Sequence, residues 1–156
     1  MPKRDPFFQT FRKRCNSLGL AATRQRFLVY QCLSHSYDHP TADMVYERVL
    51  VDSPHISRMS VYRILESFAF HRMIRKVNHP GSAAHFDAFL TPHHHIICVE
   101  CGVVVDVPLE AFAITLRPEQ IPAGINIEST TGDFQGLCSA CAQKREASGV
   151  SVRQAE

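Results

Sequence analysis

Four of the six cysteines form two closely spaced pairs, and 36 residues separate one pair from the other. Two residues between cysteines let a tight backbone turn direct both thiolates at one ion, and two such pairs complete a tetrahedron with no open position. Redox-active pairs are the main alternative, but no βαβ pattern surrounds either pair. The spacing therefore predicts a structural Zn(II) site made by Cys98, Cys101, Cys138 and Cys141.

A second group of potential ligands begins just before the first cysteine pair, at His93, His94 and His95. In an extended strand, His93 and His95 project from one side and His94 projects from the other. Asp87 precedes the triplet, and Asp106 follows it in an apolar segment where a buried carboxylate would need a cation. Imidazole and carboxylate ligands suit Fe(II), Mn(II) or Zn(II). A second metal site is the favoured interpretation, and a solvated run of histidines is the alternative.

The remaining cysteines and histidines have no comparable neighbours in the sequence. Cys15 and Cys32 fall on apolar helical faces, where a thiol behaves as a small core side chain. The other histidines considered at this point are interpreted as surface or core residues: His35, His55, His71, His79 and His85. A zinc enzyme would need an open coordination position and a glutamate such as that of a His-x-Glu motif. Because the cysteine pairs supply neither, the sequence favours a protein that is not an enzyme.

Charge is divided unevenly along the 156 residues. Residues 1–80 carry 13 Lys and Arg against six Asp and Glu, a net charge of +7, whereas residues 81–156 carry four against nine, a net charge of −5. This division predicts two lobes, of which the basic one is a candidate for nucleic-acid binding. Since no apolar run is long enough for a membrane span and no signal peptide is apparent, we expect a cytoplasmic protein with reduced thiols and no membrane partner.

Apolar residues at three- and four-residue spacing predict four helices in the basic half. The first is expected from Pro6 to about Leu18, the second from Arg24 to about Leu33, and the fourth from Arg58 to about His71. The third follows Thr41 and ends at Pro54, with Val51 on its inner face. Hydroxyl side chains at the expected starts are suitable N-caps, namely Thr23, Thr41 and Ser57.

Two extended segments, 73–77 and 84–90, predict a hairpin after the last of these helices. The turn residues between them are Asn78, Pro80, Gly81 and Ser82. Helices followed by a hairpin describe a winged helix, whose last helix enters the DNA major groove. Residues suited to base or phosphate contacts lie at its start: Arg58, Ser60, Tyr62 and Arg63. An exposed amphipathic helix of a small bundle is the alternative.

Six segments, taken in order, resemble the landmarks of the ferric uptake regulator family. They are residues 23–26, 39–43, 60–63, 86–87, 93–102 and 138–141. The resemblance runs from about Leu18 to Arg145, and its most specific part is the His-x-His followed by paired cysteines. It implies an α+β homodimeric repressor of double-stranded operator DNA. The expected parts are a winged-helix DNA-binding domain with wing and hinge over residues 1–90 and a small α/β metal-binding dimerisation domain over 91–156.

Carried over by position, the resemblance implies a regulatory metal site. Its ligands would be His39, Asp87, His93, His95 and Asp106. Only the resemblance selects His39, which lies between two predicted helices. A metal with more ligands in one arrangement of the two domains favours that arrangement, and in this family the favoured state is the one that grips DNA.

Aspartate at positions 87 and 106 is similar to the peroxide-sensing branch of the family, because iron-uptake repressors usually have glutamate there. The resemblance then implies that Fe(II) supports oxidation of His39 or His93 by peroxide, whereas Mn(II) supports DNA binding only. An iron- or manganese-uptake regulator is the alternative. The sequence departs from the family at Ala21 and Arg24, where a basic residue and a proline are common. At His94 it departs from the aromatic residue that peroxide sensors often carry.

Overall fold

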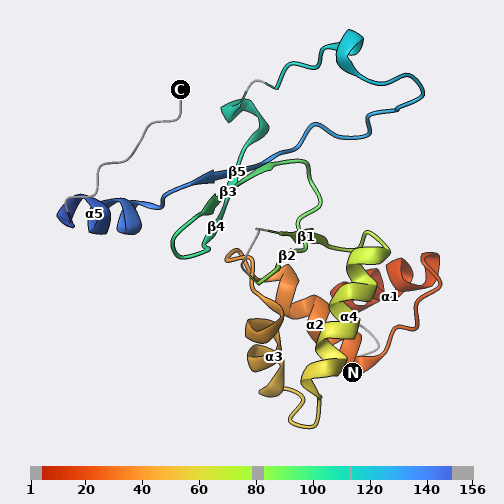
Figure 1. The fold of residues 1–156 in the computed structure, drawn as a ribbon. Coiled ribbons are helices and arrows are strands. Elements are labelled where there is room, and N and C mark those ends of the chain that lie inside the picture. The colour runs from red at the N-terminus through yellow and green to blue at the C-terminus, as the bar shows by residue number, and fades with distance from the viewer. Residues whose placement is uncertain (1–4, 79–82, 113, 149–156) are drawn as a thin grey trace. The chain divides into compact units, whose positions relative to one another are not determined.

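The computed structural model describes residues 5–78, 83–112 and 114–148. The chain divides into two compact units, residues 1–90 and residues 91–156. The N-terminal unit contains helices and a two-stranded hairpin, and the C-terminal unit is built on a three-stranded sheet (Figure 1). None of the helices in the described ranges has the length and apolar character that a membrane span requires.

Four helices form the N-terminal unit, as predicted. They are α1 (Pro6–Ser17), α2 (Arg24–Ser34), α3 (Ala42–Leu50) and α4 (Arg58–Phe70). The hydroxyls of the three predicted N-caps accept backbone hydrogen bonds from Arg26, Met44 and Ser60, which satisfies amide groups that have no partner inside the helix. The prediction for Val51 is wrong, since its side chain is 82% exposed. It lies two positions, or about 200° of helical rotation, beyond the buried Val49.

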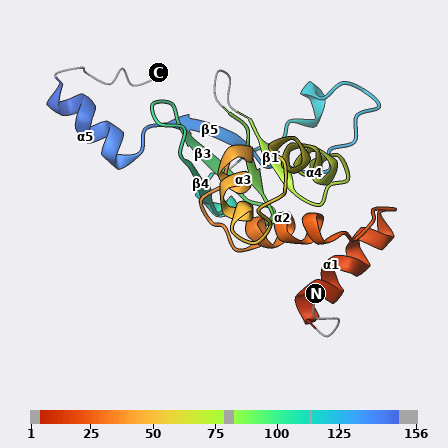
Figure 2. The same cartoon turned by 90° about the horizontal axis from the view of Figure 1, so that it is seen from below.

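An aromatic cluster forms the core of this unit. Helix α2 contacts α1, α3, α4 and the second strand of the hairpin, and Figure 2 gives a second view of these helices. The rings of Phe8 and Phe27 meet edge to face with centroids 4.9 Å apart, and Phe11 contacts both Phe27 and Phe68. Cys15 is buried in this core, as predicted, and burial raises the pKa of its thiol. Cys32 is only half-buried.

The predicted hairpin is present with shorter strands, β1 (Arg75–Val77) and β2 (His85–Asp87), paired antiparallel. Of the predicted turn residues, Asn78 is described, and Pro80, Gly81 and Ser82 lie outside the described residues. The segment before α3 also attaches to β2. Thr41 forms a β-bridge with His85, and the Phe86 amide donates to the Pro40 carbonyl at 3.1 Å. These bonds attach the chain around His39 to the strand that ends in Asp87.

The sheet of the C-terminal unit has the strand order β4-β3-β5. Strand β3 (His94–Cys98) pairs antiparallel with β4 (Val104–Val107) and parallel with β5 (Asp133–Gly136). Between β4 and β5 the chain makes a long excursion with two short 3-10 helices, η1 (Leu109–Ala111) and η2 (Pro118–Gln120). Helix α5 (Ser139–Ala147) follows β5. The sequence analysis predicts neither β5 nor α5.

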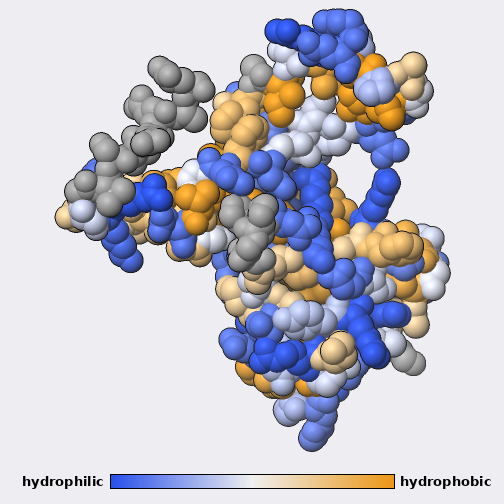
Figure 3. Space-filling model, in the orientation of Figure 1, coloured by the Kyte–Doolittle hydropathy of each residue, from blue (hydrophilic) through white to orange (hydrophobic). Residues whose placement is uncertain are grey.

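Few apolar side chains are buried in the C-terminal unit. Among its described residues they are Ile97, Cys98 and Val104, and α5 buries none. Apolar side chains of the excursion are exposed instead, and Figure 3 shows apolar surface among polar residues there: Ile114, Leu116, Ile125 and Ile127. So small a core contributes little folding energy, which makes other constraints on this unit necessary.

Candidate metal centres

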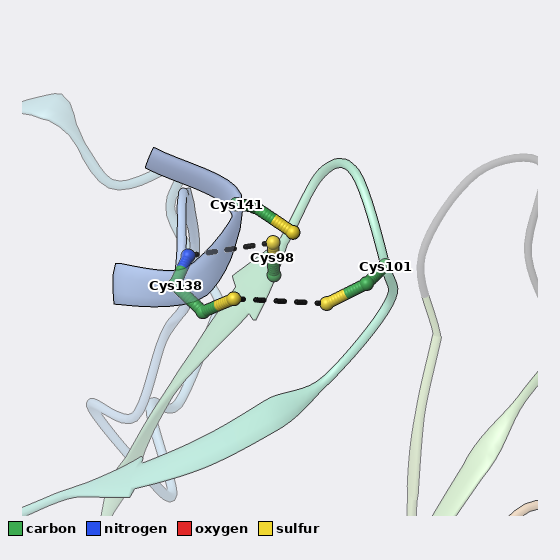
Figure 4. A group of neighbouring side chains, drawn as sticks. All are labelled: Cys98, Cys101, Cys138 and Cys141. Atoms are coloured by element: carbon green, nitrogen blue, oxygen red, sulfur yellow. Dashed lines mark hydrogen bonds between the residues drawn. The ribbon is translucent and has the colours of Figure 1, made fainter. Parts of the chain in front are cut away.

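The four paired cysteines meet at one end of the C-terminal sheet (Figure 4). Cys98 ends β3, Cys101 lies in the following turn, and Cys138 and Cys141 lie at the start of α5. Their sulfur atoms all lie within 4.8 Å of one another, and the Cys101 and Cys138 sulfurs are 3.8 Å apart. Tetrahedral zinc with Zn–S bonds of about 2.3 Å separates its sulfurs by about 3.8 Å. The cluster therefore fits a structural zinc.

Ionisation of this cluster is uneven. Burial opposes ionisation of Cys98, but hydrogen bonds from the backbone N–H groups of Cys138, Cys101 and Glu100 outweigh it and lower the pKa of the thiol to about 6. The hydrogen bond with Cys138, followed by burial, raises the pKa of Cys141 to about 12. Four thiolates repel one another without a cation, and a bound dication offsets that repulsion.

Two imidazoles and a carboxylate form a second cluster in the same unit. The Nε2 atoms of His93 and His95 are 2.9 Å apart, and Oδ1 of Asp106 lies 3.2 Å and 3.5 Å from them. Strand register explains part of this geometry, because His95 and Asp106 are directly opposite each other on β3 and β4. Two ligand atoms about 2.1 Å from one ion are about 3.0 to 3.4 Å apart at octahedral or tetrahedral angles. The three atoms thus have the spacing of metal ligands.

The hydrogen bonds around the two imidazoles assign their ring protons. Nδ1 of His93 lies 2.7 Å from the Thr91 carbonyl, and Nδ1 of His95 lies 3.0 Å from Oδ1 of Asp133. A carbonyl and a carboxylate can only accept, so each Nδ1 is the donor. In the neutral rings, both Nε2 lone pairs then face each other beside the Asp106 carboxylate. A proton on one Nε2 or a metal ion among the three atoms offsets the repulsion between these electron-pair donors, and the spacing of the atoms fits a metal ion.

Burial contradicts the solvated-run interpretation of the histidine triplet. The predicted alternation is confirmed, because His93 and His95 meet on one side while His94 packs against the rings of Phe112 and Phe134. The imidazoles of His94 and His95 are both buried. Nδ1 of His94 also accepts a hydrogen bond from the Gly132 amide at 3.1 Å. His94 therefore contributes to packing, on the side of β3 opposite the ligand cluster.

The expectation that Asp106 occupies a buried position is wrong, since 40% of its side chain is exposed. Strand β4 is an edge strand of the described sheet, and its consecutive residues Val105 and Asp106, which project from opposite faces, are both exposed. The cost of burying an isolated charge therefore does not explain this residue. Its position opposite His95 does, because that position brings a carboxylate oxygen to both imidazoles.

The other two candidate ligands, His39 and Asp87, lie in the N-terminal unit, and both are buried. His39 has a left-handed backbone with φ of 46°, which is unusual for a residue other than glycine and costs energy. Its carbonyl lies 2.5 Å from Nδ1 of His85, a partner that the sequence analysis overlooked. Oδ1 of Asp87 accepts from the Phe89 amide at 2.7 Å. Buried polar side chains and strained backbone concentrate at functional sites.

The four candidate DNA-binding residues lie in the first turns of α4. Arg58, Tyr62 and Arg63 are exposed, and the Ser60 hydroxyl lies 2.8 Å from that of Ser57. Asp43 on α3 accepts hydrogen bonds from both the Arg58 guanidinium and, at 3.1 Å, the Tyr62 hydroxyl. The sequence analysis did not identify this partner, because the contact joins two helices that no local pattern connects.

The structure shows what one arginine near the family departure at Ala21 contacts. Arg14 and Arg24 are candidates to replace the basic residue that the family commonly has at position 21. Arg14 donates hydrogen bonds within the N-terminal unit. Its guanidinium contacts the Tyr30 hydroxyl at 3.1 Å and the Arg72 carbonyl at 3.3 Å. These bonds hold Arg14 against α2 and the end of α4.

Comparisons with known proteins identify the family of this chain. Residues 17–131 match the model of the ferric uptake regulator family. The chain is 29% identical over 126 residues to the peroxide-responsive repressor PerR of Staphylococcus aureus, which covers 81% of this chain and 85% of that protein. The Helicobacter pylori ferric uptake regulator Fur has a TM-score of 0.66 at 23% identity, over 87% of this chain and 91% of that one. A zinc uptake regulator solved with zinc and DNA has a TM-score of 0.60 at 18% identity, over 94% and 99%.

The chain therefore belongs to the ferric uptake regulator family. Members of this family are metal-dependent, dimeric DNA-binding regulators of transcription rather than enzymes. The predicted fold, an α+β chain with a winged-helix domain followed by a small α/β domain, is confirmed.

Proposed function

We propose that this protein is a cytoplasmic repressor that binds operator DNA as a homodimer and senses peroxide through a regulatory Fe(II) or Mn(II) site. The observation that carries the proposal is the cluster of His93, His95 and Asp106, with two imidazole lone pairs and a carboxylate facing one another. The absence of sulfur among these donors favours iron or manganese over a site specialised for zinc. The 29% identity to a peroxide-responsive repressor supports the same function.

In this proposal, His39 and Asp87 of the N-terminal unit complete the ligand set of His93, His95 and Asp106. Their burial supports this role, since buried polar side chains concentrate at functional sites. The left-handed backbone of His39 supports it as well, because strain of this kind persists where surrounding structure requires it. Ligands from both units would couple metal occupancy to the orientation of the DNA-binding unit.

Loss of one ligand is the proposed signal. The site would hold Fe(II) or Mn(II), and Fe(II), unlike Mn(II), would supply the redox chemistry for oxidation of a nearby imidazole by peroxide. One oxygen of hydrogen peroxide would enter a ring C–H bond of His39 or His93, and the other would leave as water. Both nitrogens of the resulting imidazolone carry protons, so the residue would no longer offer a lone pair and the site would bind the metal less tightly. The state with fewer ligands then predominates, and the repressor leaves its operator.

DNA recognition is proposed for the start of α4, through Arg58, Ser60, Tyr62 and Arg63. Arginine donates a pair of hydrogen bonds to guanine, and serine and tyrosine contact phosphates or bases. Arg58 would exchange its bond to Asp43 for a bond to DNA. The zinc uptake regulator that shares this fold was solved with DNA, which supports a DNA partner.

Mass spectrometry after a peroxide pulse tests the sensing mechanism. Protein that contains its structural zinc is loaded with Fe(II) or with Mn(II), and fragmentation then locates any added oxygen. We expect an oxygen on His39 or His93 in the iron-loaded sample only, accompanied by loss of DNA binding. His55, an exposed histidine outside the proposed ligand set, is the internal control and should remain unmodified.

Two results would contradict peroxide sensing by these ligands. Equal modification of His55 and the ligand histidines would indicate non-specific oxidation. Unmodified His39 and His93, with DNA binding retained in iron-loaded protein, would favour an iron- or manganese-uptake regulator instead.

A further inference from the structure

Asp133 is a carboxylate in direct contact with the proposed regulatory site, and it is absent from the ligands selected by sequence. Its Oδ1 lies 3.0 Å from Nδ1 of His95, while Nε2 of the same ring faces His93 and Asp106. His95 is buried, so its ring is oriented by contacts with protein groups, and the Asp133 carboxylate is one of them. The imidazole thus lies between a carboxylate on one side and the proposed metal position on the other.

The two imidazoles of the site differ in what holds their second nitrogen. Nδ1 of His93 donates to a neutral backbone carbonyl, that of Thr91, whereas Nδ1 of His95 donates to a carboxylate. A charged acceptor makes the stronger hydrogen bond and fixes both the tautomer and the ring plane more firmly. Metal-ligating histidines commonly have such an outer carboxylate, and its loss typically weakens metal affinity about 10- to 100-fold.

Strand pairing places Asp133 accurately. His95 and Asp133 are opposite each other in the parallel pair of β3 and β5. The preceding residue, Gly132, is held twice: its carbonyl accepts from the His95 amide at 3.1 Å, and its own amide donates to the His94 ring at 3.1 Å. A Cβ at position 132 would lie 3.2 Å from the Phe134 ring, which is closer than an ordinary contact. Two hydrogen bonds to β3 therefore fix the backbone next to Asp133.

The same two strands connect the site to the four-cysteine cluster. Strand β3 carries His95 and ends at Cys98, and β5 begins at Asp133 and leads to Cys138. At the cysteine end, the Val99 amide donates to the Gly136 carbonyl at 2.9 Å, and the Cys138 amide donates to the Cys98 sulfur at 3.4 Å. Contacts at both ends thus maintain the register that aligns Asp133 with His95.

We propose that Asp133 is a positioning residue of the regulatory metal site, one that binds no metal itself but holds Nδ1 of His95 as the donor and Nε2 toward the metal. This inference rests on the proposed function, because it assigns His95 as a ligand. It adds a residue that sets the metal affinity of the site from outside the ligand shell.

Replacement Asp133→Asn tests the role of the charge. The variant keeps the size of the side chain, but its amide can donate or accept, so Nδ1 is no longer compelled to carry the proton. Glu119→Gln is the matched control, since it removes one carboxylate from an exposed 3-10 helix of the same unit. Mn(II) affinity is measured by electron paramagnetic resonance of the free ion, and zinc content is measured in the same samples.

We expect Mn(II) affinity to fall about 10- to 100-fold in Asp133→Asn and to stay within about twofold of the parent in Glu119→Gln. Zinc content should remain one per chain in both variants, which shows that the unit is folded. Equal Mn(II) affinities in Asp133→Asn and Glu119→Gln would overturn the proposal. Loss of zinc in Asp133→Asn would overturn it too, because Asp133 would then be required for the fold of the unit.

Nitrogen-15 shifts of the imidazoles test the same role without a regulatory metal. In the zinc-containing, Mn-free parent we expect His95 to show a fixed Nδ1–H tautomer, and in Asp133→Asn a mixture of tautomers. An unchanged His95 spectrum in the variant would overturn the proposal. If the parent binds no Mn(II), the proposed function is wrong, and these shifts still decide whether Asp133 positions His95.

Discussion

Acceptors outside the proposed ligand shell determine which imidazole nitrogens are available to a metal. The Thr91 carbonyl and the Asp133 carboxylate each accept a hydrogen bond from an Nδ1, so each ring offers a metal the lone pair of its Nε2 when it is neutral. The identity of the ligands is therefore not sufficient to define the site. The groups that hold the far side of each ring decide its tautomer and its direction.

At the proposed DNA-binding helix α4, the residue-scale prediction concerns Arg63. Replacement Arg63→Ala should weaken binding of the Mn-loaded protein to a duplex selected from a random pool, because a guanidinium contact to DNA is lost. The expected loss is about 1 to 3 kcal/mol, or roughly 5- to 150-fold in affinity. Gel retardation or fluorescence anisotropy at fixed salt measures it.

Arg117→Ala is the matched control, since it removes an exposed arginine from the C-terminal unit. Mn(II) affinity in the absence of DNA should be the same in both variants. Equal DNA affinity of Arg63→Ala and the parent would exclude Arg63 from the interface.

At the scale of elements, the described part of the C-terminal unit has little apolar packing, and a cysteine cluster brings its separate segments together. Helix α5 buries none of its side chains, and its start carries Cys138 and Cys141. The two cysteines on the other side of the cluster belong to β3 and the turn after it. A bound zinc would thus tie α5 to the sheet, and its binding free energy would be folding free energy for this unit.

Removal of zinc should therefore unfold α5 and β5 while α1 to α4 stay folded. The N-terminal helices have their own aromatic core and contain none of the four cysteines of the cluster. Hydrogen exchange after chelation measures this: we expect amide protection to be lost in residues 133–147 and retained in the N-terminal helices. Persistent protection of α5 in zinc-free protein would contradict a structural role for the metal.

Cysteine variants supply the control for the zinc experiment. Cys138→Ser should abolish stoichiometric zinc. Cys32→Ser changes a half-buried cysteine outside the cluster and should retain one zinc per chain.

At the scale of the whole molecule, the two halves of the chain carry opposite net charges that suit their proposed ligands. The basic half contains the proposed DNA-binding helix, and the acidic half contains both ligand clusters of the C-terminal unit. Positive charge attracts the DNA backbone, whereas carboxylates favour cations. The small net charge of +2 is thus the sum of a basic half and an acidic half.

The proposed coupling of metal binding to DNA binding predicts a reciprocal effect on the two affinities. If Mn(II) strengthens DNA binding by some factor, the selected duplex must strengthen Mn(II) binding by the same factor, which is typically about 5- to 150-fold. Mn(II) titrations with and without the duplex measure it, with a scrambled duplex as the control. Equal Mn(II) affinities with the selected and scrambled duplexes would show that metal binding is not coupled to operator recognition.

Local patterns account for what the sequence predicted correctly. The helices and their caps depend on residues within one turn, and the paired cysteines depend on two-residue spacing. The opposite directions of His93 and His94 follow from the period of a strand. The position of His39 in the proposed site came from family resemblance, and no local pattern indicates it.

Only the tertiary structure decided the contacts between distant segments. Asp133 meets His95 because β5 pairs with β3 in one register, and Asp43 meets Tyr62 because α3 packs on α4. It also decided that Asp106 is exposed on an edge strand and that His85 contacts the carbonyl of His39. The sequence alone determined which side chains can bind a metal and which sides of a strand consecutive residues such as His93 and His94 project from. Strand register and helix packing determined their partners, because those depend on the whole chain rather than on any local pattern.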